Sequence, residues 1–352
     1  MDNLKSIRKG EVTNVKISVT VNTTDLSDLD LQQMVQLGID CVDFGIGHSF
    51  KGVKEQGFPD LDELLKLKKR LRSWGLEVNR VTLPNITQAF MEEQPGSEKQ
   101  LENSIKAVKT FGEAGIGIVR QRFEGDVFYG RSQSYKSIQR GGLIGRGESV
   151  GLLSKKDPTP TSEELTRWWG NFQRAYREIV DVALDNNVNV AMHPSDTPHP
   201  DSPFGGIGLH RIIDDFPQKN VGFVYCIGTR AEAGGSSLVM DEINHFGRKN
   251  RIFLVHFRNV RGSLPTAGAF EEAMLDDGDL NMFKILLELD KVGYQGCINP
   301  DHVLTFAGDT PDLDDKWAFS NIGWKHSSLG FAYSIGYMKA LLNALVEYKG
   351  RA

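Results

Sequence analysis

The sequence of 352 residues has few cysteines, no long apolar run and no surplus of basic residues. Its three cysteines, Cys41, Cys226 and Cys297, have no short spacing, which argues against a disulfide framework and for a reducing compartment. No stretch approaches the roughly 18–20 apolar residues of a membrane span. The first residues, MDNLKSIRKGEV, contain no apolar core of a signal peptide. We therefore expect a soluble cytoplasmic protein without a membrane partner.

The charge pattern argues against nucleic-acid binding. The net charge is -5 at pH 7 and the sequence pI is about 5.9, whereas a nucleic-acid-binding surface needs a clustered basic face. The densest basic run, KLKKRLR at 66–72, lies in a segment whose leucines recur at helical spacing. We interpret it as the solvent-facing side of an amphipathic helix, and we expect no nucleic-acid partner.

Short apolar runs rich in β-branched residues alternate along the chain with longer runs of helical periodicity. The predicted strands are 14–21, 41–46, 77–83, 115–123, 188–193, 221–226, 252–257 and 296–299. The predicted helices lie near 27–37, 60–74, 98–113, 162–186, 207–214, 237–247, 279–291 and 327–347. Eight strand–helix pairs in one series predict an α/β fold, a (β/α)8 or TIM barrel, as a single domain over 1–352. The alternative is an open doubly wound sheet with an inserted lobe.

Residues 124–160 show little periodicity and are too numerous for an ordinary loop. They follow the predicted fourth strand, which places them on the C-terminal face of a barrel, where active sites are built. We interpret this long segment as an insertion or lid over that face. Its glycines, GGLIGRGESVG, do not directly follow a strand, so a dinucleotide-binding fingerprint is the weaker interpretation.

Four consecutive predicted strands end in residues that can bind a metal. His193, Cys226 and His256 end the fifth, sixth and seventh strands, and Asp301 with His302 follows the eighth. All strand ends of a barrel open onto one face, so we expect these side chains to converge. A lone cysteine is more often a small buried hydrophobe, and a lone histidine is often structural, but packing hardly explains four in succession. Imidazole, thiolate and carboxylate together predict a divalent-metal site without fixing the ion.

Arginines near the same strand ends are candidates for binding a carboxylate. Arg258 directly follows VHF and is suited to a bidentate grip on a carboxylate, although a surface ion pair is the alternative. Its neighbour Asn259 is a further substrate-binding candidate. Arg120 and Arg122 share one face of the fourth strand, either the barrel mouth or the helix layer. Side chains that could fix the tautomers of the metal-binding histidines are Asp196, Asn259 and Glu272.

The motifs HPSDTP, YCIGT, VHFRNV, FEEAMLDDGDLNM and NPDHV, in this order within 188–303, resemble those of the mannonate dehydratase family. That family comprises metal-dependent (β/α)8 barrels of the xylose-isomerase-like group, which convert D-mannonate to 2-keto-3-deoxygluconate with Mn(II) or a similar ion. The resemblance implies that the metal ligands are His193, Cys226, His256 and Asp301. It also implies that His302 is an acid/base, that Arg258 lies near the substrate, and that the chain forms a homodimer or a larger oligomer. Manganese is the ion we expect, although Fe, Co, Ni, Zn and Mg also suit such a set.

The sequence departs from the family pattern at the mouth of the site. HPDDPP reads HPSDTP, with Ser195 in place of an aspartate, and RPDHG reads NPDHV, with Asn299 in place of an arginine and Val303 in place of a glycine. The family also has a tyrosine before the last helix, where this chain has Lys325 or His326 in NIGWKHSSLG. The predicted ligands are intact, so these departures bear on the substrate rather than on the metal.

Dehydration of a sugar acid removes the C2 proton and expels the C3 hydroxyl. The metal can hold the carboxylate and stabilise the developing charge, while His302 is the first candidate for one proton transfer. Lys325 or His326 can take the role of the missing tyrosine if its pKa is tuned. Two alternatives remain: a sugar isomerase or epimerase, which shares the first proton abstraction, and a barrel that binds a sugar acid without turning it over.

Overall fold

The protein is a closed barrel of parallel strands. The computed structural model describes residues 14–124, 132–155, 160–195, 206–309, 321–322, 324 and 328–351. The barrel strands are β1 (Lys16–Val21), β2 (Cys41–Phe44), β3 (Glu77–Thr82), β4 (Ile118–Arg120), β7 (Asn189–Met192), β8 (Val221–Cys226), β9 (Ile252–His256) and β12 (Cys297–Asn299). They close in the order β1-β12-β9-β8-β7-β4-β3-β2. These are the eight predicted strands, so the (β/α)8 prediction is confirmed.

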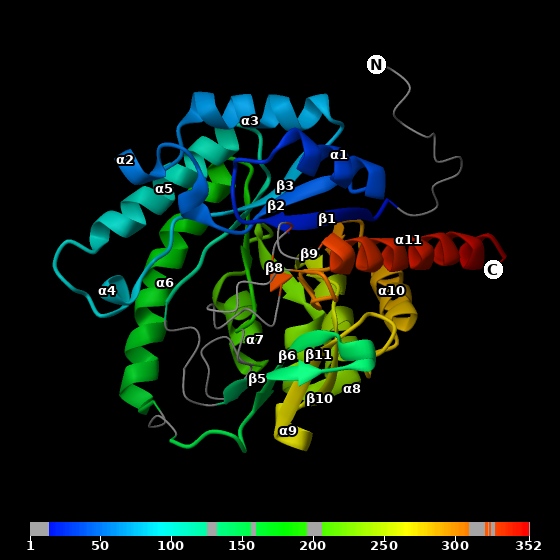
Figure 1. Ribbon diagram of the computed structural model, residues 1–352. Coiled ribbons are helices and arrows are strands. Elements are labelled where there is room, and N and C mark those ends of the chain that lie inside the picture. The colour runs from blue at the N-terminus through cyan, green and yellow to red at the C-terminus, as the bar shows by residue number, and fades with distance from the viewer. Residues whose placement is uncertain are drawn as a thin grey trace.

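Helices surround the barrel and cover its outer face (Figure 1). The main ones are α1 (Asp28–Leu37), α3 (Leu61–Ser73), α5 (Glu98–Glu113), α6 (Ser162–Asp185), α7 (Gly206–Asp215), α8 (Ile227–Arg248), α10 (Met282–Lys291) and α11 (Ser328–Arg351). The short ones are η1 (Gly47–Ser49), α2 (Val53–Gln56), α4 (Gln88–Met91), η2 (Arg140–Gly142) and α9 (Leu264–Ala267). The basic run at 66–72 lies in α3, where Leu64 and Leu71 are buried while Lys66 is exposed, as its amphipathic pattern predicts.

Helix α8 begins ten residues earlier than the sequence predicts, at Ile227 instead of 237. Its first half is buried but contains small and charged residues, among them Gly228, Arg230 and Glu232, so it shows no apolar periodicity. The helix breaks at Gly235, whose φ of 71° favours glycine. This unpredicted half follows β8 directly and therefore borders the mouth of the barrel.

A second, antiparallel sheet lies beside the barrel, in the lower part of Figure 1. It consists of β10 (Asn259–Ser263), β11 (Ala269–Ala273), β6 (Ile144–Ser149) and β5 (Gln133–Ile138), in the order β10-β11-β6-β5. No strand was predicted for these segments, because QSYKSI and IGRGES are too polar and glycine-rich to show an alternating pattern. The sheet joins part of the segment 124–160 to the chain that follows β9.

The segment after β12 is held to the same sheet. It forms β13 (His302–Val303), which pairs with β14 (Asn321–Ile322). Two backbone hydrogen bonds link Ile144 of β6 with Thr305, one in each direction, at 3.1 and 2.8 Å. The hairpin β5–β6 and the chain after the last barrel strand are thereby joined.

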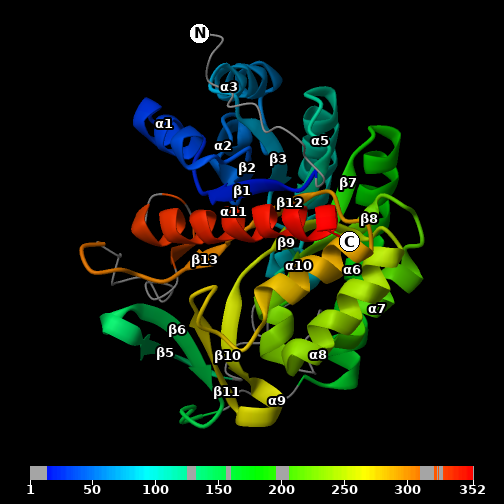
Figure 2. The same cartoon turned by 90° about the vertical axis from the view of Figure 1, so that its right-hand side faces the viewer.

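Helix α11 is the one helix in the described part of the chain that is long and apolar enough to cross a membrane, judged by length and composition alone. Its apolar residues Phe331, Ile335, Met338 and Leu345 are buried in the main core. It contacts α1 and α10 and runs along the outside of the barrel (Figure 2). Helix α11 is therefore the last helix of the layer that surrounds the barrel.

Candidate active site

The four predicted metal ligands meet at the C-terminal end of the barrel. One donor atom from each of His193, Cys226, His256 and Asp301 lies within 4.8 Å of the others, and all four residues are buried. Two ligands of one ion with bonds of about 2.0–2.3 Å are at most roughly 4.6 Å apart, so the cluster has nearly the span of a coordination shell.

The ring nitrogens of the two histidines lie close to each other and to Asp301. Nδ1 of His193 lies 2.5 Å from the carbonyl oxygen of Pro194, which makes Nδ1 the protonated nitrogen and leaves Nε2 as an acceptor. That Nε2 lies 3.2 Å from Nδ1 of His256, which in turn lies 3.1 Å from Oδ2 of Asp301. Nε2 of His256 is buried without a hydrogen bond to a described residue.

Cys226 ends β8 and caps the N-terminus of α8. Its Sγ accepts from the backbone N–H of Thr229 at 3.5 Å, from the hydroxyl of Thr229 at 3.2 Å and from Nε of Arg258 at 3.4 Å. Burial raises the pKa of this thiol, but Arg258 and hydrogen bonds from both cluster histidines outweigh burial and bring the pKa well below its ordinary value. Cys226 is thereby poised as a thiolate, the form that binds metals.

Asp301 reaches the cluster through an uncommon backbone conformation. Its φ is 56°, in the left-handed region, and its N–H donates to Oδ1 of Asn299 at 2.8 Å. The amide of Asn299 donates in turn to Asp43 at 2.6 Å and to the hydroxyls of Ser18 and Thr20. Asn299, which stands where the resembling family has an arginine, therefore supports the backbone of Asp301 and lies inside the barrel.

The donor set fits a divalent cation. Thiolate, carboxylate and imidazole are the side-chain groups that bind a divalent metal ion, and here they converge in one buried space. Burial raises the pKa of Asp301, yet the charges of His256 and His302 bring it well below its usual value, so the carboxylate is ionised. Two nitrogens, one sulfur and one oxygen suit Zn or Fe better than Ca or Mg.

His302 lies beside the cluster and is held by a glutamate. Its Nδ1 lies 2.5 Å from Oε1 of Glu272, and its Nε2 lies 3.5 Å from Oδ2 of Asp301. Burial lowers the pKa of His302, but Asp301 and Glu272 raise it above the ordinary value. Glu272 therefore orients a histidine, as the sequence suggested, but the histidine is His302 rather than a metal-ligand histidine.

A buried network of charges surrounds this pair. Arg146 of β6 contacts Glu148 at 3.0 Å and Glu272 at 2.9 Å, and Arg258 contacts Glu232 at 2.6 Å and Glu272 at 3.4 Å. Burial raises the pKa of Glu232 to about 7 against the lowering effect of the two arginines. Sequence reasoning missed Arg146, Glu148 and Glu232, because they lie in segments that gave no regular pattern.

The predicted substrate-binding residues are placed differently from one another. The guanidinium of Arg258 is already bonded to Cys226, Glu232 and Thr229, so it braces the cluster. Both amide protons of Asn259 go to backbone carbonyls and its oxygen accepts from two backbone N–H groups, which leaves no donor for a ligand. We therefore leave Asn259 out of the proposed site.

Arg120 and Arg122 lie at the end of β4, half-buried and exposed respectively. Burial and, to a smaller extent, the charge of Arg122 lower the pKa of Arg80 on β3, so the two guanidinium groups lie within electrostatic reach of each other. The remaining candidates, Asp196, Lys325 and His326, lie outside the described residues. Arg80 itself was missed, although a charged residue within the apolar run EVNRVTL was a visible signal.

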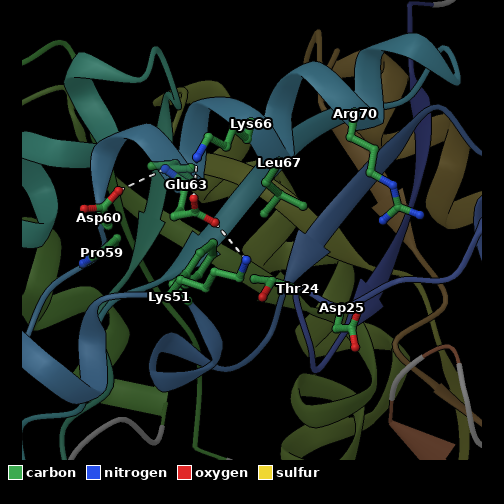
Figure 3. A pocket seen from close by; sticks show the side chains of 11 residues that line it. Thr24, Asp25, Lys51, Pro59, Asp60, Glu63, Lys66, Leu67 and Arg70 are labelled. Atoms are coloured by element: carbon green, nitrogen blue, oxygen red, sulfur yellow. Dashed lines mark hydrogen bonds and ion pairs between the residues drawn. The ribbon is translucent and has the colours of Figure 1, made fainter.

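A pocket of about 550 Å³ lies away from this centre, between α3 and the segments that follow β1 and β2 (Figure 3). Its charged residues contact one another: Lys51 and Lys66 both pair with Glu63, at 2.8 and 2.6 Å, and Asp60 caps α3. None of the four cluster residues lines it. The charges that the pocket could offer a ligand are thus largely neutralised, and the cluster of potential metal ligands lies elsewhere, at the barrel mouth.

Comparisons of the sequence with known proteins point to one enzyme family. Residues 161–351 match the sequence profile described as D-mannonate dehydratase (UxuA). A mannonate dehydratase of Streptococcus suis is 25% identical over 333 residues, which covers 82% of this chain and 84% of the relative. Mannonate dehydratase 2 of Halalkalibacterium halodurans is 23% identical over 291 residues, 73% of this chain and 83% of the relative.

Solved structures show the same fold. The crystal structure of mannonate dehydratase from Streptococcus suis serotype 2 superposes with a TM-score of 0.77 at 20% identity, over 96% of this chain and 95% of that one. An L-ribulose 3-epimerase superposes with a TM-score of 0.59 at 13% identity, over 96% and 97% of the two chains. At such identities these likenesses bear on the fold alone.

The barrel and the buried donor cluster together define a (β/α)8 barrel whose donors could hold a metal ion. The chain belongs to the D-mannonate dehydratase family, because the family profile matches more than half of it. Membership assigns it to the hydro-lyases that dehydrate sugar acids, and the isomerase or epimerase alternative is not favoured.

Proposed function

We propose that this enzyme dehydrates a mannonate-like aldonate to a 2-keto-3-deoxy sugar acid with a divalent metal ion held by His193, Cys226, His256 and Asp301. The observation that carries the proposal is the convergence of these four donors beside His302, which Glu272 holds. A cluster of ligands alone would suit many reactions. A ligand set with an adjacent, oriented acid/base suits one that moves protons next to a carboxylate.

The metal, when bound, would act as a Lewis acid that holds the substrate carboxylate and 2-hydroxyl and lowers the cost of charge at C2. His302 is the proton-transfer group. Because Glu272 occupies its Nδ1, its Nε2 is the nitrogen left to exchange a proton with the substrate. Glu272 also stabilises the protonated form of His302, which suits delivery of a proton to the leaving 3-hydroxyl.

Manganese is the ion that we propose for the site, on the basis of the resemblance and of a mixed donor set that tolerates several divalent ions. The enzyme would be stripped with a chelator and reloaded separately with Mn, Fe, Co, Ni, Zn and Mg. Turnover should be highest with Mn. A higher rate with any other ion would overturn the choice of manganese and leave the ligand set standing.

The hairpin β5–β6 belongs to the proposed site, because its Arg146 reaches Glu272. We propose that 124–160 serves as a lid on a single barrel domain, and that the enzyme is a cytoplasmic homodimer. Sedimentation analysis of the purified protein would test the dimer, and a monomer at micromolar concentration would refute it.

The decisive experiment is a screen of aldonic and uronic acids with the metal-loaded enzyme, scored for keto-deoxy product. D-Mannonate should give product, and the rate should disappear when the metal is removed. Epimerised or isomerised sugar acid without loss of water would overturn the proposed reaction. Binding of a sugar acid without any product would refute catalysis and support the alternative of a barrel that only binds sugar acids.

A further inference from the structure

Arg80 is a buried cation on the inner side of the barrel. It lies on β3, in register with Asp43 on β2, and is 1% exposed. Burial lowers its pKa, the charges of Asp43 and Asp301 raise it, and that of Arg122 lowers it. The guanidinium therefore lies within electrostatic reach of the proposed metal ligand Asp301.

Only one end of this guanidinium is bonded. Nη1 donates to the carbonyl oxygen of Phe44 at 3.0 Å and to the hydroxyl of Thr82 at 2.8 Å. Nε is buried without a partner, and neither Nε nor Nη2 makes a hydrogen bond to a residue that the structure describes. Nε and Nη2 form the side of a guanidinium that accepts both oxygens of a carboxylate at once.

The nearest candidate counter-ion is fully engaged elsewhere. Oδ2 of Asp43 accepts from Ser18 at 2.5 Å and from Asn299 at 2.6 Å, and its Oδ1 accepts from Asn79 at 2.7 Å. No carboxylate of the described residues comes within ion-pair distance of Arg80. A buried charge without a counter-ion is costly, and such groups concentrate where a ligand supplies the missing charge.

Other buried arginines show what the usual arrangement is. Arg146 and Arg258 pair with glutamates, and Arg230 pairs with Glu242 at 2.7 Å. Arg251, at the opposite end of the barrel, has no carboxylate partner among the described residues but donates to the carbonyl oxygens of Pro217, Gln218 and Val221. Within the same part of the chain, Arg80 has neither a carboxylate partner nor a full set of carbonyl oxygens.

We propose that Arg80 is the residue that binds the carboxylate of the sugar-acid substrate, side-on through Nε and Nη2. The proposal rests on the proposed function and deepens it, since it assigns the recognition of the acid group to β3 at the opposite side of the mouth from Arg258. The carboxylate supplies the missing negative charge, and the exposed Arg122 adds a second positive charge at the same edge.

The test compares binding and turnover of D-mannonate by the wild-type enzyme and by Arg80→Met and Arg80→Lys. Calorimetric Kd and steady-state KM should rise about 10²- to 10³-fold in Arg80→Met and about 10-fold in Arg80→Lys, because two charge-assisted hydrogen bonds are lost or weakened. The kcat at saturation should fall less than KM rises. Arg251→Lys is the matched control, a buried arginine away from the mouth, and should leave Kd and KM within about 2-fold.

Unchanged Kd and KM in both Arg80 variants would overturn the proposal, as would an equal rise in Arg251→Lys. If Arg80→Met does not fold, the Kd and KM of Arg80→Lys alone test the proposal. The neutral analogue D-mannitol is the second probe: the preference of the enzyme for mannonate over mannitol should shrink in Arg80→Met, and an undiminished preference would contradict a carboxylate contact.

The outcomes for the proposed function are separate. Wild-type enzyme that binds D-mannonate, loses that affinity in Arg80→Met and yet forms no keto-deoxy acid would refute the dehydration and support Arg80 as the carboxylate site. Formation of keto-deoxy acid by the wild-type enzyme, with unaltered Kd and KM in the Arg80 variants, would support the dehydration and refute Arg80 as the carboxylate site. Failure of the wild-type enzyme to bind any sugar acid in the screen would overturn both.

Discussion

The two halves of the barrel mouth handle charge in opposite ways. Around β7, β8, β9 and β12, the donors of the metal cluster and the surrounding arginines and glutamates contact one another closely. Around β1, β2 and β3, neutral donors occupy Asp43, and one side of the Arg80 guanidinium has no partner in the part of the chain that the structure describes. In the first half, the donors for a metal ion and the proposed proton-transfer residue are already arranged. In the second half, an anionic ligand would supply the charge that balances Arg80.

The largest expected effect concerns the metal. His256→Ala removes one of four donors from the first half, and metal content measured by elemental analysis should fall to near zero after dialysis, with turnover lost. Arg80→Met, in the second half, should keep the metal content of the wild-type protein. Equal metal loss in both variants would contradict the assignment of metal binding to the first half of the mouth alone.

The next effect concerns proton transfer. His302→Asn should retain the metal and lower kcat by ~10²–10⁴-fold, because an oriented acid/base is removed while the four donors stay. The measurement pairs elemental analysis with the keto-deoxy acid assay. Wild-type turnover in this variant would refute the role of His302, and loss of metal would mean that His302 serves the cluster instead.

Stability should distinguish the two buried arginines. Arg258→Met leaves Glu232 and Glu272 without one of their cations, so the free energy of unfolding should fall by about 3–5 kcal/mol. Arg80→Met removes a charge for which the described residues provide no counter-ion, so the ligand-free protein should be as stable as the wild type or more so. Urea unfolding of both variants without substrate checks the contrast, and a similar loss in both would contradict it.

The smallest effect concerns the orientation of His302. Glu272→Gln keeps a side chain that can accept a hydrogen bond at Nδ1 but removes its charge, so kcat should fall by roughly 10–10²-fold with little change in KM. Glu272→Asp, which restores the charge on a shorter side chain, should recover part of that loss. If Glu272→Asp recovers none of the lost kcat, the charge of Glu272 does not act through His302, and its role is structural.

The half of the mouth that carries the cluster could be predicted from the sequence, because its residues lie at strand ends. Once the eight strands were placed, His193, Cys226, His256 and Asp301 had to meet on one face. The other half could not be predicted in the same way. Arg80 lies within a strand, and its significance depends on which side chains Asp43 has already engaged, which no spacing reveals. The buried network was missed for a related reason, since Arg146 and Glu232 lie in an irregular hairpin and in a helix half without apolar periodicity.

The paired hydrogen bonds between Ile144 and Thr305 have a consequence for the redesign of this enzyme. They join the hairpin β5–β6 to the chain three residues beyond His302, so the two segments form one structural unit. If the hairpin were replaced by that of a relative without the matching 302–309 segment, the two hydrogen bonds and the Arg146–Glu272 contact would be lost. Chimeras that exchange both segments together should keep activity more often than those that exchange either one.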